Sequence, residues 1–91
     1  MKTALVTGAS SGIGAAFAEA LAYRGYNLVL VARSQEKLEK LAQQLQTNHQ
    51  ITTEVIPQDL SITNAAQTLF NIVTAKAINI DLLINNAGFG D

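Results

Sequence analysis

The 91-residue sequence contains no cysteine and no tryptophan, and it has only one histidine, His49, and one proline, Pro57. Without cysteine, the chain can form no disulfide, no thiolate nucleophile and no cysteine-ligated metal centre. A single histidine cannot build a histidine-rich metal site, and it argues against a Ser-His-Asp triad. We therefore predict no metal site in this chain.

Charged residues are also few, and neither sign dominates. They make up 14% of the chain, and its net charge is −1. No basic surplus is available for phosphate backbones, which argues against a nucleic-acid partner. The apolar runs are far shorter than a membrane span, and the N-terminus does not resemble a signal peptide. We expect a cytoplasmic protein with no membrane contact, folded as one domain around a packed core.

The apolar residues change their spacing in a regular way along the chain. Short, nearly continuous apolar runs alternate with segments of helical spacing. This pattern predicts strands over about 3–7, 28–32, 51–56 and 80–85, and helices over about 12–24, 35–47 and 62–77. Strands joined by helices of this length cannot form hairpins, so the βαβαβαβ order predicts an α/β fold with a parallel sheet.

The first predicted helix has apolar residues four apart at Ile13, Phe17 and Leu21, which we expect to form its inner face. Gly25 is a plausible stop for this helix.

Hydroxyl side chains precede the other two helices. Ser34 is the expected cap of the second helix, and Ser61 or Thr63 that of the third. Phe70 lies at core spacing within the third helix. We expect His49 to be a solvated side chain in a polar loop.

A glycine-rich loop follows the first strand and opens the first helix. Gly8 allows a sharp turn, Gly12 leaves room for a phosphate near backbone N–H groups, and Gly14 permits close helix–sheet packing. The helix N-terminus attracts a pyrophosphate, and Ser10 and Ser11 add hydroxyl donors. A merely flexible turn is the simpler alternative. A Walker loop is excluded because alanine, not lysine, follows the last glycine.

The TGxxxGxG spacing of this loop resembles that of the classical short-chain dehydrogenase/reductase family. Further elements follow in the family's order: Arg33 after the second strand, Asp59-Leu60 after the third, and Asn-Asn-Ala-Gly at 85–88 after the fourth. The resemblance covers the whole chain and implies a truncated, doubly wound Rossmann-type fold with strand order 3-2-1-4. The cofactor-binding residues that it implies are Gly8, Ser10, Ser11, Gly12, Ile13, Gly14, Arg33, Ser34, Asp59, Leu60, Asn85, Asn86, Ala87 and Gly88.

The resemblance also bears on which nicotinamide cofactor is bound. The family's acidic position at the end of the second strand falls on Ala32, which cannot bind a ribose 2′-hydroxyl. Arg33 follows, and its guanidinium suits a 2′-phosphate, with Ser34 assisting. We therefore favour NADP(H) over NAD(H). The alternative is an ordinary surface arginine at a helix entry.

Two further elements have family roles. The aspartate at the position of Asp59 accepts a hydrogen bond from the adenine amine, and Leu60 supplies backbone contacts. The alternative for Asp59 is a simple turn residue. The segment 85–88 runs along the cofactor ribose, and one of its asparagines braces neighbouring strands, a role that is itself structural.

The family's catalytic set is missing. Its tyrosine is followed four residues later by lysine, whereas here Asn27 follows Tyr23 and Leu30 follows Tyr26 at that distance. That set would lie beyond Asp91, so we expect the cofactor-binding half of an NADP(H)-dependent reductase that transfers no hydride by itself. The alternatives are a non-catalytic dinucleotide-binding or oligomerising module and, disfavoured by the missing acidic residue, a methyltransferase.

The expected strand order leaves the segment 80–85 at an open edge of the sheet. Its apolar residues are Ile80, Leu82, Leu83 and Ile84. Only one helix is expected on one of the two sheet faces, so an apolar edge and part of a face stay uncovered. Such surfaces promote self-association, and we expect a dimer or a larger assembly.

Overall fold

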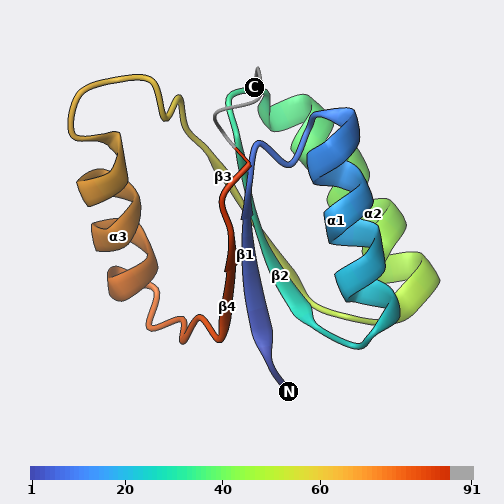
Figure 1. Ribbon diagram of the computed structural model, residues 1–91. Coiled ribbons are helices and arrows are strands. Elements are labelled where there is room, and N and C mark those ends of the chain that lie inside the picture. Colours follow the sequence, from blue (N-terminus) through green and yellow to red (C-terminus); the bar gives the residue numbers. More distant parts are fainter. Residues whose placement is uncertain (87–91) are drawn as a thin grey trace.

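Four parallel strands form one sheet with helices on both faces (Figure 1). The computed structural model describes residues 1–86. The elements are β1 (Thr3–Thr7), α1 (Gly12–Tyr23), β2 (Asn27–Ala32), α2 (Gln35–His49), β3 (Thr53–Pro57), α3 (Ala65–Ala75) and β4 (Leu82–Ile84). The strand order β3-β2-β1-β4 and the parallel pairing confirm the predicted α/β fold.

The sheet separates two apolar clusters. Helices α1 and α2 cover one face, and α3 alone lies on the other, as Figure 1 shows. Strands β1 and β2 are buried almost throughout because both of their faces are covered. Within the described residues 1–86, no helix is long and apolar enough to cross a membrane.

The short strand β4 is tied to β1 at both ends. At its start, the Thr3 amide donates to Asp81 Oδ2 at 2.9 Å, and the Asp81 amide donates to the Thr3 carbonyl at 2.8 Å. Beyond its end, the Asn86 amide donates to Thr7 Oγ1 at 2.8 Å. These bonds hold a strand of three residues in register with β1.

The expected inner face of α1 was wrong for Ile13 and Phe17, whereas Leu21 is half-buried and packs against the core. Ile13 is 56% exposed and Phe17 45% exposed. The buried face consists instead of the small residues Gly14, Ala18 and Ala22, one position further along the chain. Small side chains let the helix lie close to the sheet, and this close approach outweighs the burial of larger apolar groups.

Phe70 likewise does not lie in the core. It is 65% exposed, while its neighbour Leu69 is buried against the sheet together with Val73. The face of α3 that meets the sheet is thus set one residue before the phenylalanine.

The predicted stop of α1 and the predicted N-terminal cap of α2 are confirmed. Gly25, with φ of +87°, follows the end of α1. Ser34 Oγ caps α2 by accepting from the Lys37 amide at 3.3 Å. Helix α2 runs on to His49, two residues further than expected.

The predicted start of α3 was wrong. The capping position is Asn64, with φ of +67°, and not Ser61 or Thr63. Ser61 lies three residues before the capping position, and its hydroxyl donates to Asp59 Oδ1 within the preceding loop. Strand β3 also starts and ends later than expected, and its last residue, Pro57, lies on an edge strand, where a missing N–H removes no ladder bond.

His49 is not a solvated loop residue. It is the last residue of α2, and its Nε2 pairs with the Glu19 carboxylate of α1. Its ring also meets the Tyr23 ring edge-on, with 6.4 Å between the ring centroids. His49 therefore joins the two helices on this face of the sheet.

Replacing Ala18 by leucine is expected to lower the free energy of unfolding by about 1–3 kcal/mol, because added volume forces α1 away from the sheet. Ala20→Leu on the exposed face of the same helix should change it by less than about 0.5 kcal/mol. Urea unfolding of both variants measures the difference. Equal effects would show that α1 does not need small residues on its inner face.

Candidate functional site

The loop between β1 and α1 folds around the carbonyl oxygen of Gly8. This oxygen accepts hydrogen bonds from the Ser11 amide at 3.2 Å, from Ser11 Oγ at 2.9 Å and from Asn86 Nδ2 at 3.3 Å. The Ala9 amide donates to the Val31 carbonyl at 3.1 Å, which ties the turn to the end of β2. The loop is therefore a braced turn, and the alternative of a flexible one is not what the structure shows.

Ser11 has a different role from the expected one of phosphate donor. Its hydroxyl proton goes to Gly8, and its oxygen accepts from the Gly14 amide at 3.2 Å as the cap of α1. The donor that we expected Ser11 to offer to a phosphate is thus used inside the loop. Ser10 lies half-buried in the same turn, and Ile13 is exposed on the first turn of α1.

Asn86 is the buried brace of this loop. Its side-chain amide donates to Ser11 Oγ at 3.1 Å as well as to Gly8, and its backbone amide donates to Thr7 Oγ1. Thr7 Oγ1 in turn donates to Asn85 Oδ1 at 3.0 Å. Thr7 was not among the predicted site residues, although a hydroxyl at the end of a buried strand was the available signal. Ala87 and Gly88 lie outside the described residues.

The three glycines of the loop have different reasons to be glycine. A Cβ on Gly14 would lie 2.0 Å from the Gly8 carbonyl oxygen, and one on Gly8 would lie 3.0 Å from the Asn86 carbonyl oxygen. A Cβ on Gly12 would meet no atom within 4 Å. The fold itself therefore requires glycine at positions 8 and 14. It does not require glycine at Gly12, where the open space at the N-terminus of α1 fits a cofactor phosphate.

Arg33 and Asp59 follow adjacent strands of the sheet. The Gln58 amide donates to the Ala32 carbonyl at 2.7 Å. Arg33 and Asp59 are the residues that directly follow these two bonded residues. The Asp59 pKa is lowered first by hydrogen bonds from the Ser61 hydroxyl and amide and then by the charge of Arg33. Asp59 is therefore ionised at neutral pH, and it lies in the turn that the alternative interpretation required.

Ser34 and Leu60 make mainly structural contacts. The Ser34 hydroxyl caps α2, and the Leu60 side chain packs against the apolar cluster under α3. Leu60 also lines a groove of about 440 Å³ between α3 and the sheet, together with Thr7, Leu83 and Asn85. The backbone of Leu60 is what remains for contact with a cofactor.

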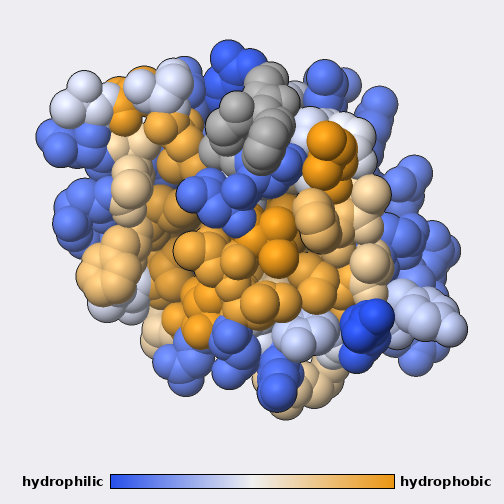
Figure 2. Space-filling model, in the orientation of Figure 1, coloured by the Kyte–Doolittle hydropathy of each residue, from blue (hydrophilic) through white to orange (hydrophobic). Residues whose placement is uncertain are grey.

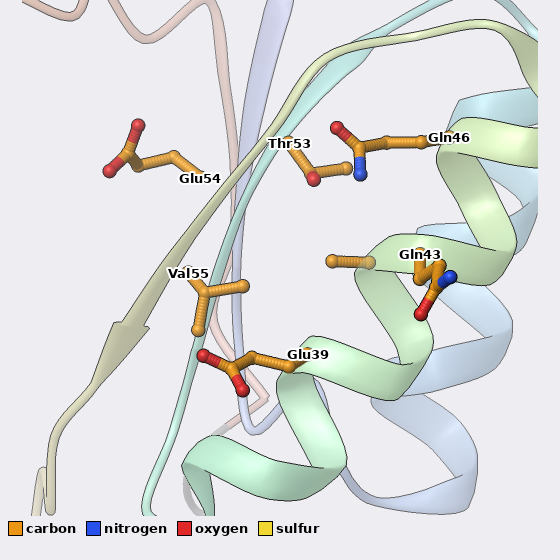
Figure 3. Close-up of a pocket in the computed structure, with 7 residues that line it drawn as sticks. Glu39, Gln43, Gln46, Thr53, Glu54 and Val55 are labelled. Atoms are coloured by element: carbon orange, nitrogen blue, oxygen red, sulfur yellow. The ribbon is translucent and has the colours of Figure 1, made fainter.

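A second hollow, of about 620 Å³, lies between α2 and β3 (Figure 3). Figure 3 shows the side chains of Gln43 and Gln46 on one side of β3 and that of Glu54 on the other. The Glu54 carboxylate pairs with Lys76 Nζ at 2.9 Å. None of the predicted site residues lines this hollow, so it is separate from the candidate cofactor site.

The pattern that defines the short chain dehydrogenases matches residues 2–91. The chain belongs to the short-chain dehydrogenase family. It is 42% identical over 87 residues to the very-long-chain 3-oxoacyl-CoA reductase of Debaryomyces hansenii, covering 96% of this chain and 25% of that protein. Among curated relatives of this kind, the match thus spans about a quarter of the length.

Solved structures give the same result. The bulky-bulky ketone specific alcohol dehydrogenase of Comamonas testosteroni is 43% identical with a TM-score of 0.86, covering 100% of this chain and 36% of that chain. A short-chain dehydrogenase of Sphingobium yanoikuyae in complex with NADPH is 41% identical with a TM-score of 0.84, covering 96% and 34%. These matches support the binding of a nicotinamide dinucleotide.

Gly14→Ala is expected to lower the free energy of unfolding by about 3 kcal/mol or more, because backbone must move to admit the new Cβ. Gly12→Ala is the matched control and should change it by less than about 1 kcal/mol. Urea unfolding followed by circular dichroism compares the two. Similar losses in both variants would contradict the division of the glycines into structural and open positions.

Proposed function

We propose that this chain binds NADP(H) at the carboxyl edge of its sheet and holds the adenosine, the 2′-phosphate and the pyrophosphate. The observation that supports this most is the open space at Gly12 within a loop that is otherwise braced. A loop with fixed backbone donors needs no reorganisation when an anion binds, and one bare position lets the anion approach closely.

The pyrophosphate is proposed to lie at the first turn of α1. The N–H groups of Gly12 and Ile13 stand at the start of that helix, where no carbonyl one turn earlier accepts them within the helix. Gly14 is not among these donors because its amide is bound to Ser11. The helix dipole adds a partial positive charge at the same place.

Arg33 is proposed to recognise the 2′-phosphate. Ala32, at the end of β2, provides no carboxylate to bind a ribose diol, and Arg33 directly follows it. Asp59 lies close enough to feel the Arg33 charge, so the phosphate shares the guanidinium with this carboxylate. A guanidinium has five N–H donors, which is enough for both partners. The NADPH complex of the Sphingobium yanoikuyae relative supports this choice.

Hydride transfer between NADP(H) and a carbonyl or alcohol is the activity that we propose for a short-chain dehydrogenase containing this segment. When bound, the nicotinamide would supply or accept the hydride. No tyrosine in the 91 residues stands four positions before a lysine. The role proposed for these residues is therefore to bind and orient the cofactor, with the proton transfer left to groups outside them.

Calorimetric titration of the chain with NADPH and NADH tests the cofactor proposal. NADPH should bind more tightly, and Arg33→Ala should weaken NADPH by about 10- to 100-fold, as expected for a lost charge-assisted hydrogen bond, with little effect on NADH. Gly12→Ala should weaken both cofactors.

Arg24→Ala is the matched control for the loss of one positive charge, since Arg24 lies at the far end of α1. Equal losses of NADPH affinity in the Arg24 and Arg33 variants would show that the effect comes from net charge and not from a contact with Arg33. Binding of neither cofactor by the unmodified chain would contradict the proposed function.

We also propose that the chain associates with a second copy of itself through the edge of β4. Figure 2 shows a continuous apolar area over β4, between α3 and α1. Leu83 is 60% exposed, Leu82 and Ile84 are half-buried, and no charged residue lies within the strand. An edge strand without charges or proline is open to pairing with another chain.

Light scattering after size exclusion is expected to show a dimer or larger species. Leu83→Lys should shift it toward the monomer, because a charge at the edge must be desolvated on pairing. Ile62→Lys, at a residue that is 62% exposed outside β4, is the control and should leave the mass unchanged. A stable monomer of the unmodified chain at high concentration would contradict this proposal.

A further inference from the structure

Gln58 connects three elements at the carboxyl edge of the sheet. It follows β3 directly, its backbone amide donates to the Ala32 carbonyl at the end of β2, and its side-chain Nε2 donates to the Ala65 carbonyl at 2.8 Å. Ala65 is the first residue of α3. One residue thus joins the ends of two strands to the start of the following helix.

The Gln58 contact defines one end of the loop that carries Asp59 and Leu60. The side chain of Asn64, at the capping position of α3, makes no capping hydrogen bond. The loop is otherwise held by bonds within itself, from Ser61 to Asp59 Oδ1 and from the Ile62 amide to the Asp59 carbonyl at 3.4 Å. Two further contacts join the loop to α3: the Ala65 amide donates to the Ile62 carbonyl at 3.0 Å, and the Leu60 side chain packs under the helix. The amide of Gln58 adds a side-chain hydrogen bond at the start of the loop.

The side chain of Gln58 also has a feature that lowers stability. Its Oε1 is buried and has no hydrogen-bond partner within residues 1–86. A buried acceptor without a partner destabilises a protein, so an apolar side chain of similar length would serve stability alone better. The amide at this position is thus better explained by what it holds in place than by core stability.

We propose that Gln58 is a positioning residue for cofactor recognition: it holds the Asp59 carboxylate at the place where the adenine amine binds. This inference rests on the proposed function and deepens it, because it assigns selectivity for the base to a residue that need not touch the cofactor. Arg33 selects the 2′-phosphate, whereas the Gln58 contact selects the amino group of adenine through Asp59.

The test compares NADPH with its hypoxanthine analogue, in which oxygen replaces the adenine amine. The unmodified chain should bind NADPH about tenfold more tightly than the analogue, the effect of one charge-assisted hydrogen bond. Gln58→Met keeps the side-chain length but removes the donor to Ala65. In this variant the ratio of the two affinities should fall toward one.

A merely structural role predicts a different result. If the substitution only lowered stability or loosened the loop, it would weaken the binding of both ligands equally and leave the ratio of their affinities unchanged. That result would overturn the proposal. Gln67→Met on exposed α3 is the matched control, because it removes another glutamine amide, one that donates to Asn71 at 3.0 Å, and it should leave the ratio intact.

Gln58→Glu provides a second variant of the same volume that cannot donate to Ala65 when ionised. In this variant, too, the ratio of the affinities for NADPH and the analogue should fall toward one. Failure of both Gln58 variants to fold, measured by circular dichroism, would overturn the proposal in favour of a structural role. If the unmodified chain bound NADPH without preferring it to the analogue, only this inference would fail. If it bound no NADPH, the proposed function would fail, and this inference with it.

Discussion

The close approach of α1 to the turn after β1 is the constraint on which the rest of this structure depends. The α carbon of Gly14 faces the Gly8 carbonyl so closely that no side chain fits between them. This contact sets the angle at which α1 leaves the sheet, and the inner face of the helix follows from it. It also directs the Gly8 carbonyl toward Ser11 and Asn86, which brace the loop. Packing of the core and shape of the site therefore have one origin.

Much of the fold could be predicted from the sequence because strand and helix periods are local properties. The runs at β1 and β2 are apolar on both faces. On α2 the apolar spacing predicts an inner stripe of Leu38, Leu41, Ala42 and Leu45, of which Leu41 is half-buried against the core and the others are buried. The inner face of α1 could not be predicted in the same way. Hydrophobicity favours Ile13 and Phe17, but the contact with the sheet requires small residues, and that requirement appears only once the helix is placed. The start of α3 after Asn64 depends likewise on the path of the preceding loop, which places Ser61 beside Asp59 and away from the helix.

The candidate site was predictable where the reason lies in a residue's own type and position, as for Gly14, whose Cβ would meet the Gly8 carbonyl. The cofactor roles of Gly12 and Arg33 stay predictions. It was not predictable where a residue acts through distant partners. Ser11 carries the right group for a phosphate, yet its hydroxyl is bound within the loop. The role of Gln58 cannot be recognised in the sequence because its hydrogen-bond partners are the backbone carbonyls of Ala32 and Ala65. Contacts of this kind depend on which strands become neighbours, and residue types alone do not report it.

The attachment of β4 to β1 has a consequence for the order in which the structure assembles. The bonds that hold β4 join residues 77 to 79 positions apart, from Thr3 with Asp81 to Thr7 with Asn86. Closing so long a loop costs chain entropy that no local contact repays, so these pairings form late. Because Asn86 belongs to this last group, the glycine loop acquires its final brace only after the earlier strands have paired. A chain emerging from the ribosome would therefore carry a glycine loop without this brace until its eighty-sixth residue is free to fold back.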